Sequence, residues 1–142
     1  MPTTTMDPPA PSSRPPQDRP ARVLYAEDLH DLRELMRLIL HRAGYEVETV
    51  ADGDEALRRL RAPRADFDLL ITDHHMPQVN GLELVRRLPT TPFRGKVMVF
   101  SSEIDPAVHQ EYHRLGVRVI LPKPIRPDTL RRVLEQLLAP AP

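Results

Sequence analysis

The chain has 142 residues, which is enough for one domain with a hydrophobic core of its own. It carries 20 Lys and Arg against 20 Asp and Glu, so the zero net charge gives no reason to expect direct DNA binding or binding to a membrane surface. It has no cysteine, which excludes disulfide frameworks, thiolate metal sites and cysteine nucleophiles. No apolar run approaches the roughly 18 residues of a membrane-spanning helix, and no signal peptide is recognisable, so we expect a soluble cytoplasmic protein.

Residues 1–20 have a composition of their own. They hold seven of the 17 prolines of the chain and almost no large apolar side chains. Such a segment cannot bury enough surface to offset the entropy of ordering it, so we predict a disordered, proline-rich N-terminal tail. A proline-rich recognition motif for a partner protein is the alternative interpretation.

From residue 21 onward, the sequence alternates between strand and helix patterns. Apolar runs or polar–apolar alternation predict five strands, at residues 23–26, 46–50, 67–72, 97–100 and 117–121. Apolar residues at helical spacing predict a helix after each strand, and Gly44 and Gly116 are expected to end the first and fourth helices. This alternation predicts an α/β fold with a parallel sheet covered on both faces. We assign residues 21–138 to one domain and 139–142 to a short C-terminal tail.

Polar side chains follow the predicted strands at their carboxyl ends, where ligands bind in open parallel sheets. They are Glu27 and Asp28 after the first strand, Asp73 after the third, Ser101 and Ser102 after the fourth, and Lys123 after the fifth. Three carboxylates close together repel unless a cation is present, and hard oxygen ligands suit Mg²⁺. A carboxylate can accept a phosphoryl group when a metal ion and a lysine neutralise the charge on the phosphoryl oxygens.

The combination resembles the receiver domain of two-component response regulators, of the single-domain type related to chemotaxis regulators. The matching segments are Glu27-Asp28, residues 73–81, residues 99–102 and Lys123-Pro124, and the resemblance covers about residues 21–138. It implies a flavodoxin-like, doubly wound sheet of five parallel strands in the order 2-1-3-4-5, with five helices.

The resemblance also implies a role for each matching residue. Asp73 is the expected phosphoacceptor, Lys123 contacts the phosphoryl group, and the hydroxyl of Ser101 moves toward it. Mg²⁺ is expected on Glu27, Asp28, Asp73 and the backbone carbonyl of His75. The Lys123–Pro124 peptide bond is expected to be cis.

The function that the resemblance implies is that of a stand-alone response regulator. A sensor histidine kinase or a histidine phosphotransfer protein would donate the phosphoryl group, and the modified domain would change its binding to an unknown downstream protein. The protein would not be an enzyme in its own right, although it would assist its own phosphorylation and dephosphorylation.

Four positions set the sequence apart from the family pattern or suggest modulation. Ile120 stands where the family usually has a switching Tyr or Phe, and Ser102 replaces a common alanine. His75 and Glu103 stand at positions that flank the route of the hydrolysing water in this family. We hypothesise that these two side chains tune the lifetime of the phosphoryl group.

Other interpretations remain open at this point. A degenerate pseudo-receiver could act as a constitutive protein-interaction module. A phosphatase with an aspartyl nucleophile is disfavoured, because His75 stands where its D-x-D pattern has the second aspartate. A nucleotidase or GTPase is disfavoured because no G-x-x-x-x-G-K phosphate loop is present. A zinc site on His74 and His75 is not expected, because adjacent side chains in an extended segment point to opposite sides. Tyr112 and His113 could belong to a partner surface or pack at a helix edge.

Overall fold

The computed structural model describes residues 19–139, which form one five-stranded parallel sheet in the order β2-β1-β3-β4-β5. The strands are β1 Arg22–Ala26, β2 Glu46–Val50, β3 Leu69–Asp73, β4 Lys96–Ser101 and β5 Val119–Pro122. The helices are α1 His30–Arg42, α2 Gly53–Arg61, α3 Gly81–Arg87, α4 Pro106–Arg114 and α5 Pro127–Leu137, with a short 3-10 helix, η3, at Leu88–Thr90. The predicted fold class, strand order and number of helices are confirmed. Most of the predicted N-terminal tail, residues 1–18, and residues 140–142 lie outside the described residues.

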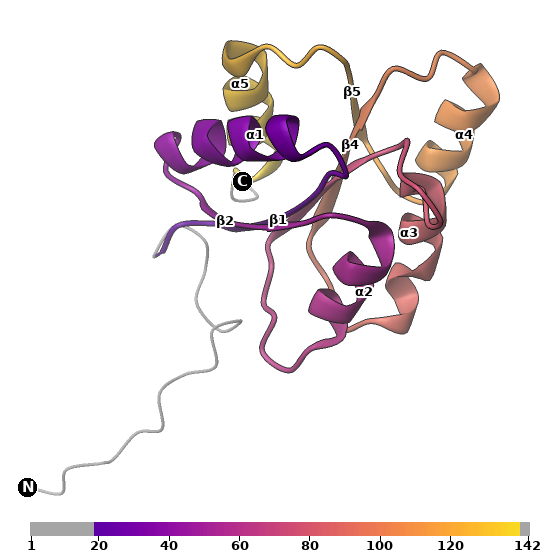
Figure 1. Ribbon diagram of the computed structural model, residues 1–142, viewed down its shortest axis with the longest axis horizontal. Helices are drawn as coiled ribbons and strands as arrows, with labels where there is room; N and C mark the ends of the chain where they lie inside the picture. Colours follow the sequence, from indigo (N-terminus) through magenta and orange to yellow (C-terminus); the bar gives the residue numbers. More distant parts are fainter. Residues whose placement is uncertain (1–18, 140–142) are drawn as a thin grey trace, which may run out of the picture.

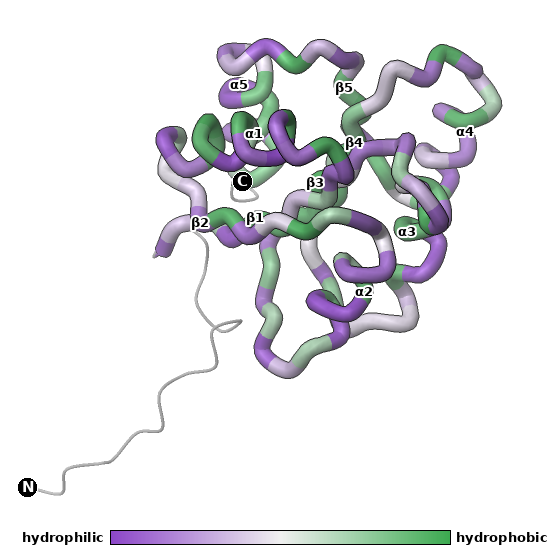
Figure 2. Tube along the Cα trace, in the orientation of Figure 1, coloured by the Kyte–Doolittle hydropathy of each residue, from purple (hydrophilic) through white to green (hydrophobic). Residues whose placement is uncertain are grey.

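The helices cover the two faces of the sheet in two layers (Figure 1). On one face, Val23 and Tyr25 of β1 pack with Met36 of α1 and Leu130 of α5. On the other face, Leu24 and Ala26 of β1 pack against α2 and α3, and β4 packs against α4. Along the tube of Figure 2, the central strands are mostly hydrophobic while the helices alternate between the two colours. This pattern follows from burial of a parallel sheet on both of its faces.

Helix ends explain where several loops begin. Gly44 and Gly116 adopt φ angles of +99° and +95°, which glycine tolerates and other residues rarely adopt. After Gly116, the backbone N–H of Val117 donates to the carbonyl oxygen of Tyr112 at 3.0 Å. This is the hydrogen bond of a Schellman ending, in which the residue after the glycine closes the helix. The two glycine stops predicted from the sequence are therefore confirmed.

Two strands begin later than the apolar runs predict. Strand β3 starts at Leu69 rather than at Phe67, whose ring lies 5.0 Å below the guanidinium carbon of Arg22. Strand β5 starts at Val119 rather than at Val117, because Val117 belongs to the ending of α4. Both residues are buried, so the apolar runs correctly indicated burial but not strand structure.

Candidate functional site

Parallel strands bring residues distant in sequence to one edge of the sheet. Asp73 is the last residue of β3 and Ser101 the last of β4, while Glu27 directly follows β1. All three side chains are buried. Carboxylate oxygens of Glu27, Asp28 and Asp73 lie within 4.8 Å of one another. The acidic residues that the sequence predicts to converge are therefore together in the structure.

Lys123 reaches the same group from the loop after β5. Its Nζ lies 2.7 Å from Oδ1 of Asp73, in an ion pair rather than a well-directed hydrogen bond, and 3.4 Å from Oε1 of Glu27. Its backbone N–H donates to the carbonyl oxygen of Ser101 at 3.2 Å, and the Lys123–Pro124 peptide is cis. One ammonium thus bridges two of the three carboxylates.

The electrostatics of the group are dominated by burial. Burial, followed by the charge of Asp73, raises the pKa of Glu27 above its ordinary value. Burial alone would lower the pKa of Lys123, but Asp73 and Glu27 outweigh it and raise that pKa above its ordinary value. The ammonium therefore stays protonated at neutral pH. The one positive charge of this ammonium is smaller than the charge that Glu27, Asp28 and Asp73 would carry if all three were ionised.

This donor set fits Mg²⁺. The ligands are carboxylate oxygens, which Mg²⁺ prefers, and a divalent cation would offset the cost that ionisation of buried Glu27 carries. Glu27 is held by its neighbours, since the Tyr25 hydroxyl donates to Oε1 at 3.2 Å and the Leu29 backbone N–H donates to Oε2 at 3.2 Å. The role of the His75 carbonyl oxygen as a metal ligand stays a prediction, because none of its contacts in the structure tests it.

Residues 23–135 match the protein family described as the response regulator receiver domain. The chain belongs to this family. It is a receiver domain of the kind found in two-component signal transduction, and its sheet order and helices match those of chemotaxis-regulator-like neighbours.

Individual relatives agree with this assignment. The chain is similar to chemotaxis protein CheY4 of Vibrio cholerae, with a TM-score of 0.74, 36% identity and coverage of 83% of this chain and 98% of that one. It is 35% identical to a response regulator receiver protein of Anaeromyxobacter over 73% of this chain and 43% of that protein. It is 34% identical to sensor histidine kinase AruS of Pseudomonas aeruginosa over 81% of this chain and 12% of that protein. The chain spans 12 to 19% of the length of several curated relatives that it matches. Across residues 19–139, none of the helices has the length and hydrophobicity needed to cross a bilayer.

In this receiver domain, Ser101 is bonded within its own loop. Its Oγ accepts a hydrogen bond from the backbone N–H of Glu103 at 2.8 Å. Ser102 is exposed, and Ile120 is half-buried in a cluster with Val85, Val99, Tyr112 and Val117. The position of the missing aromatic residue is thus occupied by an aliphatic side chain packed against α4.

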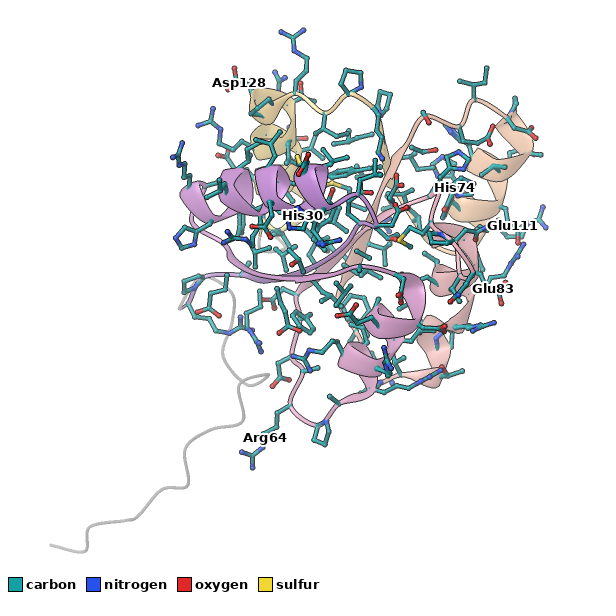
Figure 3. The ribbon with its side chains drawn as sticks, viewed as in Figure 1. His30, Arg64, His74, Glu83, Glu111 and Asp128 are labelled. Atoms are coloured by element: carbon teal, nitrogen blue, oxygen red, sulfur yellow. The ribbon has the colours of Figure 1, made fainter. Side chains whose placement is uncertain are left out.

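Two residues of the receiver domain have contacts that the sequence did not reveal. Nδ1 of His74 lies 2.6 Å from the hydroxyl oxygen of Tyr112, which is fully buried on α4. His74 follows Asp73 directly and lies close to α4 in Figure 3. Burial, followed by the nearby His75, lowers the pKa of His74, so its ring is neutral at pH 7. Tyr112 therefore packs inside the domain and does not belong to a partner surface, whereas His113 is exposed.

The expectation that His74 and His75 point to opposite sides is wrong. Their ring centroids are 4.7 Å apart, and one ligand atom from each of His74, His75 and Glu103 lies within 4.8 Å of the others. Strand β3 ends at Asp73, so the backbone is no longer extended where these two side chains leave it. The alternation of side chains between the two faces of a strand holds only as far as Asp73 and does not extend to His74 and His75.

Proposed function

We propose that Asp73 accepts a phosphoryl group from a phosphohistidine, with Mg²⁺ as cofactor, and that this modification changes which downstream protein the domain binds. The donor would be a sensor histidine kinase or a histidine phosphotransfer protein, and residues 21–138 would form the functional unit. The observation that carries this proposal is the position of the Asp73 carboxylate, 2.7 Å from Lys123 and grouped with Glu27 and Asp28.

In the proposed transfer, a carboxylate oxygen of Asp73 attacks phosphorus while the bond from phosphorus to the donor imidazole breaks. The products are an acyl phosphate on Asp73 and an unmodified histidine on the donor. Lys123 already lies beside Asp73 and would contact a phosphoryl oxygen. Mg²⁺ on Glu27, Asp28, Asp73 and the His75 carbonyl would supply the positive charge that neutralises the remaining phosphoryl oxygens.

The proposed output begins at Ser101. Its hydroxyl would turn from the N–H of Glu103 toward a phosphoryl oxygen, which frees the loop that leads into α4. Because α4 also contacts His74 through Tyr112, the loop and the helix would respond together. Phosphorylation would thereby shift the population toward a conformation with a different surface near α4 and β5.

The proposal is tested by incubating the full chain with Mg²⁺ and acetyl phosphate, or with a phosphorylated histidine donor. We expect a gain in intact mass by one phosphoryl group that hydroxylamine removes and that is absent from Asp73→Asn. An Asp105→Asn variant, changed at the exposed N-cap of α4, should be modified like wild type. Modification that persists in Asp73→Asn, or no modification of wild type, would contradict the proposal; the second result would favour a constitutive interaction module.

A further inference from the structure

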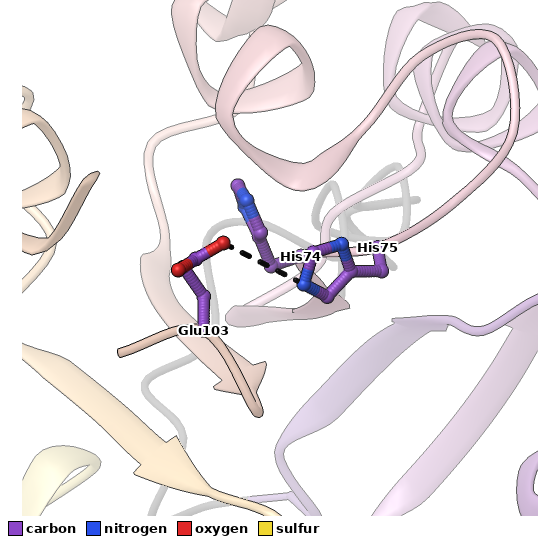
Figure 4. A group of neighbouring side chains, drawn as sticks. All are labelled: His74, His75 and Glu103. Carbon is purple, nitrogen blue, oxygen red and sulfur yellow. Dashed lines mark ion pairs between the residues drawn. The ribbon is translucent and has the colours of Figure 1, made fainter. Parts of the chain in front are cut away.

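A second group of potential metal ligands lies beside the cluster of Glu27, Asp28 and Asp73. It consists of His74 and His75, which directly follow β3, and Glu103, which follows β4 (Figure 4). Two imidazoles and one carboxylate are a ligand set that proteins use for zinc, with a fourth position left for water or another ligand. The cluster of Glu27, Asp28 and Asp73 offers oxygen ligands only. It therefore favours Mg²⁺, whereas the group with two imidazoles favours zinc-class metals.

Neighbouring groups orient two of these three side chains. Nδ1 of His74 contacts the Tyr112 hydroxyl at 2.6 Å, which leaves Nε2 as the nitrogen available to a metal ion. Oε1 of Glu103 accepts the backbone N–H of Asp105 at 2.9 Å, and Oε2 lies 3.9 Å from Nε2 of His75. Such outer contacts, which hold a histidine ring or a carboxylate in place, are typical of metal ligands.

The backbone around Glu103 is also held in place. Its N–H donates to Oγ of Ser101 at 2.8 Å, and its carbonyl oxygen lies 2.9 Å from Nε2 of His109. His74 is buried at 6% exposure, whereas the side chain of His75 is 59% exposed. The group therefore combines a fixed inner ligand and an oriented carboxylate with an outer ligand that is accessible from solvent.

We propose that His74, His75 and Glu103 bind one zinc-class transition-metal ion. Zinc–ligand bonds of about 2.0–2.2 Å would bring the three ligand atoms to roughly 3–3.5 Å from one another. The ligand atoms now lie within 4.8 Å of one another, so the widest separation must close by up to roughly 1.5 Å. Rotation of the exposed His75 side chain and of the Glu103 side chain can provide this. A bound ion would connect the loop after β3, which follows Asp73, to the loop after β4, which follows Ser101.

The test is a titration of the full chain with Zn²⁺ by calorimetry. The buffer contains saturating Mg²⁺, which occupies the carboxylates of Glu27, Asp28 and Asp73. We expect one equivalent of Zn²⁺ to bind, and His75→Ala and Glu103→Gln each to weaken binding by at least about tenfold. With Co²⁺ in place of Zn²⁺, we expect the intense visible absorption of a four-coordinate site. His41→Ala, an exposed histidine in the last turn of α1, is the matched control and should bind like wild type.

A further variant distinguishes zinc binding at the two histidines from zinc binding at the carboxylates of Glu27, Asp28 and Asp73. Asp73→Asn should keep its Zn²⁺ affinity if the ion binds to the histidines. The proposal is overturned if His75→Ala and Glu103→Gln both bind Zn²⁺ like wild type, or if Asp73→Asn alone abolishes binding. Neither result depends on phosphorylation, so this proposal can fail while the proposed function stands, and the reverse also holds.

Discussion

The hydroxyl oxygen of Tyr112 lies 2.6 Å from Nδ1 of His74, so a side chain adjacent to Asp73 contacts the buried face of α4 directly. Tyr112 shares its cluster with Val85, Val99 and Val117, and Ile120 packs against the same cluster. The family usually places an aromatic ring at the position of Ile120 on the fifth strand, whereas in this receiver domain the buried ring of Tyr112 packs beside Ile120 from α4. The hydrogen bond gives α4 a direct connection to the residue that follows the phosphoacceptor.

Replacing Tyr112 with Phe keeps the ring and removes only this connection. We expect Tyr112→Phe to lower the free energy of unfolding by about 1–3 kcal/mol, because Nδ1 of buried His74 loses its partner. Urea denaturation with an unchanged m-value is the measurement. The control is Tyr45→Phe, since Tyr45 is half-buried and its hydroxyl makes no hydrogen bond with any of residues 19–139. Equal stability changes in the two variants would show that the His74 contact contributes nothing.

The pKa of Glu27 gives a prediction on pH dependence. Burial and the charge of Asp73 raise this pKa above 4.5, so the folded state binds the proton more tightly than the unfolded chain. The stability associated with protonated Glu27 is fully present below pH 4.5 and is lost as the pH rises through the folded pKa. In metal-free buffer at pH 7, Glu27→Gln should therefore be more stable than wild type, by about 1.4 kcal/mol for each unit by which the pKa is raised.

Urea denaturation at pH 4.5 and pH 7 measures this effect. The advantage of Glu27→Gln should be larger at pH 7 than at pH 4.5. Glu135→Gln, at an exposed position on α5, should show no such dependence. An advantage of Glu27→Gln that is equal at both pH values would mean that the ionisation of Glu27 costs the fold nothing.

Removal of Mg²⁺ gives a separate prediction on stability. An ion that binds the folded state alone should stabilise wild type by about 2.7 kcal/mol when its concentration is 100 times the dissociation constant. We expect EDTA to remove this stabilisation and Asp28→Asn to show little of it. Asp54→Asn changes an exposed carboxylate in the first turn of α2 and should retain the full effect. A stabilisation that survives in Asp28→Asn would place the ion elsewhere.

The prediction about phosphoryl lifetime concerns His75 and Glu103. In this family the two positions flank the approach of the hydrolysing water to the phosphoacceptor. Here their side chains lie 3.9 Å apart, and that of His75 is exposed. Removal of both in a His75→Ala, Glu103→Ala variant should open this approach to water and shorten the half-life of phosphorylated Asp73 by roughly threefold, a change of about 0.7 kcal/mol in the barrier. The decay is followed by mass spectrometry in zinc-free buffer, with His41→Ala, Glu135→Ala as the matched double control. An unchanged half-life would discard the hypothesis.

The sequence predicted much of the fold because local patterns and global topology agree. The predicted strand at residues 46–50 has the bounds that the structure shows, and Gly44 and Gly116 mark the helix ends as predicted. These features depend on backbone conformation and capping, which neighbouring residues determine. The convergence of Glu27, Asp28, Asp73 and Lys123 followed from the rule that parallel strands share one carboxyl edge.

Contacts of side chains between elements were harder to predict. The approach of Tyr112 to His74 depends on how α4 packs, and a tyrosine on an amphipathic helix is equally compatible with an edge or a partner surface. The grouping of His74, His75 and Glu103 depends on how the backbone turns after Asp73. The spacing of residues along the chain predicts neither the His74–Tyr112 contact nor the grouping of His74, His75 and Glu103.

The most direct measurement is a crystal structure of the full chain with Mg²⁺ and beryllium fluoride, a mimic of the phosphoryl group. We predict beryllofluoride on a carboxylate oxygen of Asp73, contacts to it from Nζ of Lys123 and Oγ of Ser101, and Mg²⁺ on Glu27, Asp28 and Asp73. An unmodified Asp73, with the magnesium ion away from these carboxylates, would contradict the proposed function.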